Sequence, residues 1–343
     1  MKKVLPLAIA AALAIPAAAM ADATVYGKIR VATDNVNEEV TLCAAGLCAT
    51  ANDDRWGMSD QSSRLGIKGS EDLGNGLKAI YQFEFGATAG EQFNGLTGRN
   101  AFVGLAGGFG TFLAGRHDTP MKMSTSKLDL FADTIADNDT GSPGIAGHSG
   151  LFSDRRVDGA IAYVSPNLSG LTFAGAVVQF DTTNDFANAY SVAAMYENGP
   201  FFGSLAYEQL DYTNLIGSTD DEQDWRLGLG LMDMAGFTVT FIYEDNTSFG
   251  GVDGLDYQNY QISGAYKLGA GSIKAMYGYQ DVDNSNYEYD TWAIGYQHNL
   301  SKRTDAQIIY TERDANESGL LDGVYVSSDY NMDGFSLQLN HSF

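Results

Sequence analysis

The sequence is poor in proline, cysteine and basic residues, and it contains no long apolar run after residue 21. Its 343 residues include 6 Pro, 2 Cys and 20 Lys and Arg against 43 Asp and Glu, a formal net charge of −23. So few basic residues argue against a nucleic-acid-binding protein, because neutralising phosphates requires clustered Lys and Arg. The lack of apolar runs excludes a bundle of membrane helices, each of which needs about 20 consecutive apolar residues.

The composition instead favours strands. The chain contains 40 Gly, 19 Tyr and 18 Phe, and 44% of its residues are hydrophobic. Aromatic residues are enriched in strands, and a hydrophobic content of this size is too high for a disordered acidic chain. We therefore expect an all-β protein.

The first 21 residues have the three parts of a secretory signal peptide. Lys2 and Lys3 form a basic start, an apolar stretch follows, and Ala19-Met20-Ala21 is a small-x-small cleavage site. The apolar stretch is short and is interrupted by prolines, which disfavours a membrane anchor. The sequence thus predicts cleavage after residue 21 and export of residues 22–343.

Cys43 and Cys48 are the only two cysteines. In an exported chain, two cysteines five residues apart most simply close a small disulfide loop. A metal site is the alternative, but two cysteines with no nearby histidine supply too few ligands. We expect the disulfide.

Apolar and polar residues alternate along many segments of the chain. Examples are TVYGKIRV at residues 24–31 and FSLQLNHSF at residues 335–343. Successive strand residues point to opposite faces, so each segment has one apolar face and one polar or small face. A soluble sandwich would show the same alternation, and the pattern alone does not decide between the two.

Three further features favour a transmembrane barrel. Aromatic residues end the apolar faces, as expected of girdles at two membrane interfaces, and the opposite faces carry charged groups that a packed interior would not tolerate unpaired. Tight turns also alternate with longer acidic links, as they do in outer-membrane barrels. We count sixteen strands, which places both termini on the periplasmic side and leaves a water-filled lumen: near 23–34, 62–71, 76–87, 98–106, 111–117, 154–164, 171–180, 188–198, 201–212, 224–233, 237–246, 257–268, 272–283, 290–299, 304–313 and 334–343.

One strand fits the alternation poorly. In the segment 98–106, Arg99 shares its parity with Ala101, Val103 and Leu105. Regular alternation would turn these apolar residues toward the lumen together with the arginine.

The connection at 118–153 is too long for an ordinary hairpin loop, so it is either functional or a solvated loop. It contains Asp129, Asp133 and Asp137 at a spacing of four. If this segment is helical, that spacing places the three carboxylates on one face.

Three segments and the last residue resemble the general bacterial porin family, the trimeric sixteen-stranded porins of Gram-negative bacteria. The segments are SRLGIKGSEDLGNGLKAIYQFE at 63–84, GRNAFVGLAGGFGTFLAGR at 98–116 and RRVDGAIAYVSPNLSGLTF at 155–173, and the last residue is the aromatic Phe343. The likeness runs through the whole mature chain, but from about residue 181 to 333 it consists of strand rhythm alone.

The resemblance implies an outer-membrane homotrimer for passive diffusion of ions and small hydrophilic solutes, with residues 118–153 folded inward as a constriction loop. Basic groups on one wall would face acids on that loop. The basic positions are Lys28, Arg64, Arg99 and Arg156; the acidic ones are Asp133 and Asp137, with Asp129 beside them. Phe343 resembles the family's assembly signal, and the small residues Gly104 and Ala106 would permit close subunit contact.

Two other functional classes remain as alternatives. An outer-membrane hydrolase would need a base beside a nucleophile, but the four histidines lie in no recognisable motif; a non-conducting structural barrel is disfavoured by the charged inner faces. We expect no enzyme, no cofactor and no dedicated metal site. Acidic loops facing lipopolysaccharide should recruit divalent cations as bridges, since oxygen ligands suit Ca²⁺ and Mg²⁺.

Overall fold

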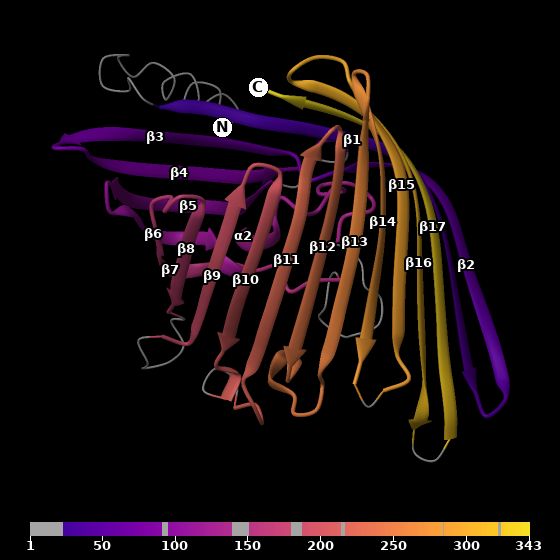
Figure 1. Ribbon diagram of the computed structural model, residues 1–343. Helices are drawn as coiled ribbons and strands as arrows, with labels where there is room; N and C mark the ends of the chain where they lie inside the picture. The colour runs from indigo at the N-terminus through magenta and orange to yellow at the C-terminus, as the bar shows by residue number, and fades with distance from the viewer. Residues whose placement is uncertain are drawn as a thin grey trace, which may run out of the picture.

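The computed structural model describes residues 23–90, 95–138, 151–179, 187–213, 217–283, 285–321 and 324–343, so the predicted signal peptide lies outside the described residues. These ranges contain one short helix, α2 (Pro120–Thr125), one 3-10 turn, η1 (Phe249–Gly251), and seventeen strands in a single sheet (Figure 1). The strands are β1 (Thr24–Ala44), β2 (Leu47–Asp60), β3 (Arg64–Gly74), β4 (Leu77–Ala87), β5 (Leu96–Gly107), β6 (Gly110–Asp118), β7 (Arg156–Val164), β8 (Leu171–Val178), β9 (Ala189–Asn198), β10 (Phe201–Leu210), β11 (Glu222–Met234), β12 (Phe237–Thr247), β13 (Tyr257–Leu268), β14 (Gly271–Val282), β15 (Glu288–Asn299), β16 (Thr304–Leu321) and β17 (Val324–Ser342).

The seventeen strands form a closed antiparallel barrel with sixteen positions around its circumference. The strands β2 and β3 both pair with the same edge of β1. β3 pairs with residues 24–28 of β1, and β2 pairs with residues 31–44. Together they occupy one position. This confirms the predicted sixteen-stranded barrel.

The barrel closes between the first and last strands. β1 and β17 pair without a register break from Lys28 opposite Ser342 to Ala44 opposite Val326. Beyond β17, Phe343 exchanges two backbone hydrogen bonds with Gly27, at 3.0 and 3.1 Å. The described ends of the chain therefore lie at the same end of the barrel (Figure 1).

The burial pattern is the reverse of that of a soluble protein. Charged side chains such as Glu222 and Asp224 are fully buried on the inner face, whereas Val103, Leu205 and Ile262 are more than half exposed on the outer face. An apolar outer face with a polar interior is typical of a barrel in a lipid bilayer. Among the described residues, no helix combines the length and apolar character needed to cross a membrane.

The wall of the barrel is uneven in height. β6 and β7 have nine residues each and β8 has eight, whereas β1 has 21, β16 has 18 and β17 has 19. The sequence predicts that the first strand ends near residue 34 and that the last strand begins near residue 334. It also leaves residues 35–61 outside any predicted strand. That segment is instead a hairpin whose second strand, β2, is exposed on both faces along most of its length, so it has no alternating apolar face from which a strand is recognised.

A bulge in β5 explains why the segment 98–106 does not fit a regular alternation of inward and outward residues. The register with β4 shifts between Phe83, which is opposite Ala101, and Phe85, which is opposite Gly98. The extra residue reverses the alternation, so Arg99 faces the lumen beside the inward-facing Glu84 while Val103 is 61% exposed on the outer face.

Candidate pore constriction

The described residues 119–138 and 151–155 lie inside the barrel, and the first of these segments contains the helix α2. The Thr119 hydroxyl accepts a hydrogen bond from the backbone N–H of Lys122, which caps the helix, and Pro120 occupies its first turn. Met121 is fully buried and packs against Ala193 and Ala206 of β9 and β10. The helix is thereby fixed to the inner wall.

After α2 the loop crosses the lumen along the opposite strands. Phe131 and Ala136 are fully buried against Met276, Ala293 and Ile309 of β14 to β16. An apolar patch on the inner wall therefore receives the apolar residues of the loop, which explains why this segment folds inward.

Polar side chains of β12, β14, β16 and β17 donate hydrogen bonds to carbonyl groups of the loop backbone. The donors come from four strands: Thr240 to the carbonyl of Leu128 at 2.8 Å, Lys274 to that of Leu130 at 2.8 Å, Arg313 to that of Ile135 at 2.5 Å, and Gln338 to that of Asp133 at 3.0 Å. Buried carbonyl groups of an irregular segment need such partners.

The returning limb is also held. Leu151 and Phe152 are buried in a cluster with Leu128. The backbone N–H of Ser153 donates to Glu244 at 3.0 Å, and the Ser153 hydroxyl lies 2.9 Å from the Tyr257 hydroxyl. The described residues of both limbs are therefore held against the inner wall of the barrel.

A cavity of about 310 Å³ lies between the loop and the wall formed by β3, β5 and the ends of β6 and β7. Five basic and five acidic side chains line it: Arg64, Arg99, Lys122, Arg156 and Arg226, with Asp118, Asp129, Asp133, Asp137 and Asp154. All the sequence-predicted residues of the constriction except Lys28 thus lie around one cavity.

Asp133 joins the loop directly to the basic wall. Its carboxylate forms ion pairs with Arg64 and with Arg30, the latter at 2.8 Å, and these three side chains are 14–20% exposed. Arg30 also donates to the Asp133 carbonyl at 3.3 Å. The predicted acid therefore contacts the arginines and does not face them across an open gap.

The other two predicted arginines are paired with carboxylates of the wall. Arg99 donates to Glu84 at 2.6 Å, and Glu84 also accepts a hydrogen bond from the Tyr26 hydroxyl at 2.9 Å. Arg156 forms an ion pair with Asp118 at 2.8 Å.

The remaining predicted groups differ in their contacts. Lys28 lies two residues before Arg30 on the same face of β1 and makes no ion pair within the described part of the chain. Asp137 accepts a hydrogen bond from the backbone N–H of Asp133. Burial in the loop, with the nearby charge of Asp137, raises the pKa of the Asp129 carboxyl well above its usual range.

Sequence reasoning missed several members of the site. Arg30 has the same parity as Lys28, so alternation placed it on the polar face, but no motif distinguished it. Glu84 and Asp118 gave no signal before the register of the strands was known. On the far side of the cavity, Arg226 is 1% exposed between Glu244 and Asp154, each at 2.5 Å.

Regular alternation with the outward-facing Ile161 predicts that Val157 also faces lipid, and this prediction is wrong. The register with β6 shifts between Gly115 and His117, so β7 carries a bulge at Asp158 and Gly159, whose φ is +64°. Val157, expected on the lipid face, packs instead inside the barrel against Val178 and Leu210. Arg156 is the first residue of β7, at the end of the short strands where residues 119–138 enter the barrel. Its side chain reaches the cavity from there.

The same bulge places an ion pair on the outer face. Arg116 lies opposite Ala101, and Ala101 lies opposite the outward-facing Phe83. Arg116 pairs there with Asp158 at 2.8 Å, and the Asp158 side chain is 78% exposed.

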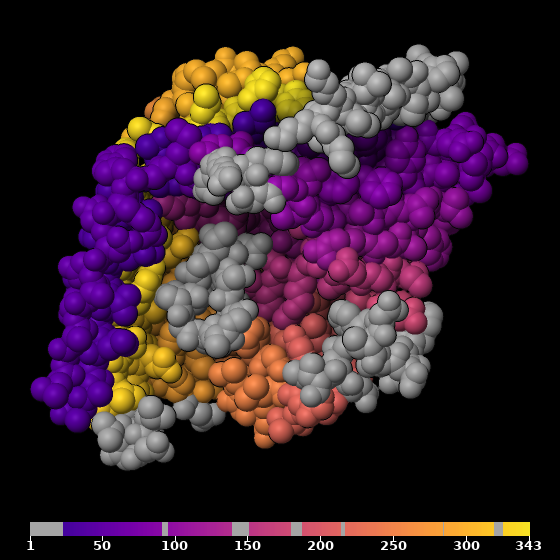
Figure 2. Space-filling model, turned by 180° about the vertical axis from the view of Figure 1, so that it is seen from behind, coloured from indigo at the N-terminus to yellow at the C-terminus, as the bar shows by residue number. Residues whose placement is uncertain are grey.

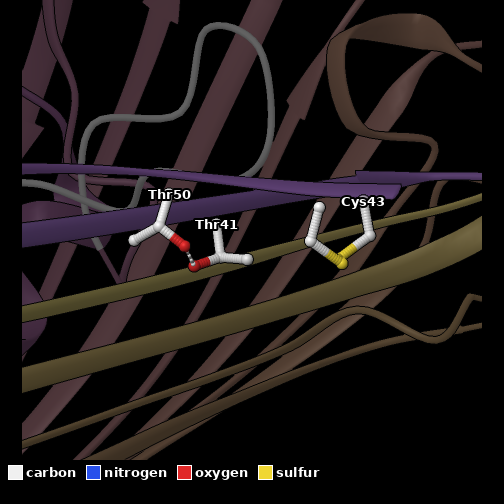
Figure 3. Close-up of a disulfide and its surroundings, with 4 residues drawn as sticks. Thr41, Cys43 and Thr50 are labelled. Atoms are coloured by element: carbon white, nitrogen blue, oxygen red, sulfur yellow. Dashed lines mark hydrogen bonds between the residues drawn. A yellow bond between two sulfur atoms is a disulfide. The ribbon is translucent and has the colours of Figure 1, made fainter. Parts of the chain in front are cut away.

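The structure also brings together the predicted cysteines. Cys43 and Cys48 form a disulfide at the end of the β1–β2 hairpin, with the hydroxyl groups of Thr41 and Thr50 bonded to one another at 2.8 Å beside it (Figure 3). At the opposite end of β1, the Phe343 ring lies over Gly27, where an added Cβ would be 2.5 Å from the ring.

Comparisons of the sequence and of the structure with known proteins both find porins and related outer-membrane proteins. A family model described as Gram-negative porin matches residues 8–318. The major outer membrane protein P.IB of Neisseria gonorrhoeae is 30% identical over 321 residues, which cover 86% of this chain and 89% of that protein. Similar solved structures include an anion-selective porin from Comamonas acidovorans, with a TM-score of 0.72, 24% identity and coverage of 94% and 99%. Another is OmpT of Vibrio cholerae in its trimer form, with a TM-score of 0.63, 14% identity and coverage of 94% and 99%.

Proposed function

Since this chain belongs to the Gram-negative porin family and is an outer-membrane channel, we propose that the loop at 118–153 and the basic wall set its ion preference. A fixed field across a narrow aqueous gap attracts ions of one sign and orients dipolar solutes. The proposal assigns this field to Lys28, Arg64, Arg99 and Arg156 with Asp129, Asp133 and Asp137, and it adds Arg30.

The observation that carries the proposal is an excess of positive charge on one side of the constriction. Five basic groups gather there, and three carboxylates pair with them: Lys28, Arg30, Arg64, Arg99 and Arg156, against Asp133, Glu84 and Asp118. Ion pairing therefore leaves a net positive wall. We propose a preference for small anions, in keeping with the similarity to the anion-selective porin from Comamonas acidovorans.

The test is the reversal potential of purified protein in a planar bilayer across a salt gradient. Replacing Arg64, Arg99 and Arg156 together by Ser should shift permeability toward cations at low salt. The shift should weaken as salt rises, because the Debye length falls from about 10 Å at 0.1 M to about 3 Å at 1 M. An unchanged reversal potential at low salt would place the selective region elsewhere.

We also propose a homotrimer whose subunits meet on the low side of the barrel. The strand β6 has nine residues, and the outward-facing Arg116 is the seventh of them. An arginine facing lipid costs about 2–4 kcal/mol at the midplane and less toward the interfaces, and a neighbouring subunit would remove that cost. The expected role of Gly104 is wrong, because Gly104 lies opposite the buried Leu113 on the inner face.

Two further proposals concern the signal peptide and the contact of the barrel with lipopolysaccharide. We propose that residues 1–21 are removed on export and that acidic side chains of the described extension, such as Glu39 and Asp53, bind lipopolysaccharide through divalent cations. Chelation should then lower the binding of purified lipopolysaccharide to the protein. Among the described residues, no group of three or more His, Cys, Asp or Glu is arranged to hold a metal ion by itself.

Catalysis is disfavoured by the surroundings of the described histidines. His117 lies 2.8 Å from the backbone carbonyl of Asp118, His298 lies 3.0 Å from the Tyr296 hydroxyl, and His341 lies 2.9 Å from the Thr304 hydroxyl. Within the described ranges, none of them donates a hydrogen bond to a carboxylate that would orient it, as a base for a nucleophile would require. We therefore propose a channel without enzymatic activity.

A further inference from the structure

An apolar groove of about 740 Å³ lies at the tip of the extension that β1, β2, β16 and β17 form beyond the rest of the wall. In Figure 2 these strands form one edge of the molecule, where the indigo of the N-terminal strands lies beside the yellow of the C-terminal ones. The apolar lining of the groove includes Leu42, Ala44, Leu47, Ala49 and Val326, with Glu317 at one side.

These residues share one face of the extension. Leu42 lies opposite both Ala49 and Ser328, and Ser328 lies opposite Glu317; Ala44 lies opposite Leu47 and Val326. The pairing of β1 with β17 has no break between Lys28 and Ala44, so Leu42 and Ala44 have the parity of Lys28. The groove therefore continues the lumen face of the barrel.

An apolar surface is out of place on this face. The same face is lined by charged and amide groups lower in the barrel, yet here Leu42 is 57% and Leu47 is 80% exposed. Exposed apolar patches with polar surroundings mark binding sites in soluble regions of proteins. The volume also falls within the range of about 300–1,000 Å³ that small-molecule sites occupy.

The charge around the groove selects the sign of the ligand. Glu317 lines the groove, and Glu38 and Asp53 lie on the same face below it. Between residues 31 and 60, Arg55 is the one basic residue, and it is bound to both Glu38 at 2.8 Å and Asp53 at 2.5 Å. Negative charge therefore remains in excess beside the apolar floor.

We propose that this groove is a binding site for an amphipathic organic cation, with the apolar body on Leu42 and Leu47 and the cationic group toward Glu317. The Cys43–Cys48 disulfide closes the hairpin that forms one wall, so it holds the groove in shape. The site is separate from the constriction, and its occupancy is measured without any reference to conduction.

The experiment is equilibrium dialysis of tetrabutylammonium against the full protein in phosphatidylcholine nanodiscs, with empty nanodiscs as the blank. We expect one saturable site per chain and weaker binding of tetramethylammonium, which has less apolar surface. Replacing Leu42 and Leu47 by Ser should weaken binding about fivefold, because apolar contact area is lost. Glu317→Gln should weaken it about threefold, as expected for a single solvent-exposed charge pair.

The matched control is Trp56→Ser. Trp56 is 65% exposed and lies opposite Asn35, on the other face of the same hairpin. This variant should bind tetrabutylammonium like the wild type, and all variants should keep the wild-type conductance, which shows that the barrel is folded. The double variant Cys43→Ser with Cys48→Ser should bind more weakly.

Two results would overturn the proposal. Wild-type protein without saturable binding would mean that another part of this chain or a second copy covers the groove. Equal loss of binding in the Trp56→Ser variant would mean that the cation adsorbs nonspecifically to the apolar surface of the extension.

Discussion

Replacing Asp133 by Asn removes one negative charge from the centre of the basic wall with the smallest change in shape. Asp133 has a φ of +58°, in the left-handed region that Asn tolerates better than most residues. The hydrogen bonds from Arg30 and Gln338 to its backbone carbonyl do not depend on the carboxylate. We therefore expect the loop to stay in place.

The size of the effect follows from Coulomb's law. The substitution leaves Arg30 and Arg64 without their shared carboxylate, so an ion passing near them meets one additional positive charge. At about 8 Å in water this charge contributes roughly 0.5 kcal/mol before screening by salt. Screening at low salt reduces this to about 0.2–0.4 kcal/mol, by which an anion is favoured and a cation disfavoured, so the permeability ratio changes by about two- to fourfold.

The assay is the reversal potential in a planar bilayer across a tenfold gradient of KCl, measured at low and at high total salt. Glu39→Gln is the control, because it removes the same charge from an exposed position on β1 outside the constriction. Asp133→Asn should shift the reversal potential toward anions at low salt and much less at 1 M. An equal shift in both variants would refute the assignment of Asp133 to the selective region.

Three further outcomes are expected. Deleting Phe343, or replacing Gly27 by Val so that its side chain collides with the Phe343 ring, should deplete folded barrel from the outer membrane on a heat-modifiability gel, whereas Gly57→Val on the exposed β2 should not. The raised pKa of Asp129 means that acidification neutralises this acid at a higher pH than an ordinary aspartate, so anion preference should increase as the pH falls, and Asp129→Asn should remove that part of the pH dependence in reversal-potential titrations. Replacing Arg116 and Asp158 by Leu should preserve the trimer band in chemical crosslinking, while Arg116→Glu, which places two acids together, should lower the temperature at which that band is lost.

Alternation was sufficient to predict the architecture, because one face of each strand meets lipid and the other meets water. Alternation with the outward-facing Leu65 and Ile67 places Arg64 on the lumen face, and β3 is regular around that residue. It failed at Val103, Leu105 and Val157, where a single extra residue in the strand reverses the faces. A bulge of this kind has no reliable sequence signature, although the glycine at 159 with its positive φ is typical of one.

The contacts of the constriction loop could be predicted only in outline. The length of the 118–153 segment and its apolar residues indicated a loop that packs on a wall. Its anchors, such as Lys274 and Arg313, come from strands more than 140 residues later, and nothing in the local sequence connects them to the loop. The pairing of Asp133 with Arg30 likewise depends on how far the loop crosses the lumen.

The most direct test of the charged constriction is the reversal potential of the unmodified protein at low salt. The net charge of the whole chain and the local charge of the constriction wall predict opposite signs of this potential. The whole chain is strongly acidic, with a net charge of −23, and this alone would favour cations. The excess of basic groups on the constriction wall predicts a preference for anions instead. A reversal potential on the cation side at low salt would contradict the account.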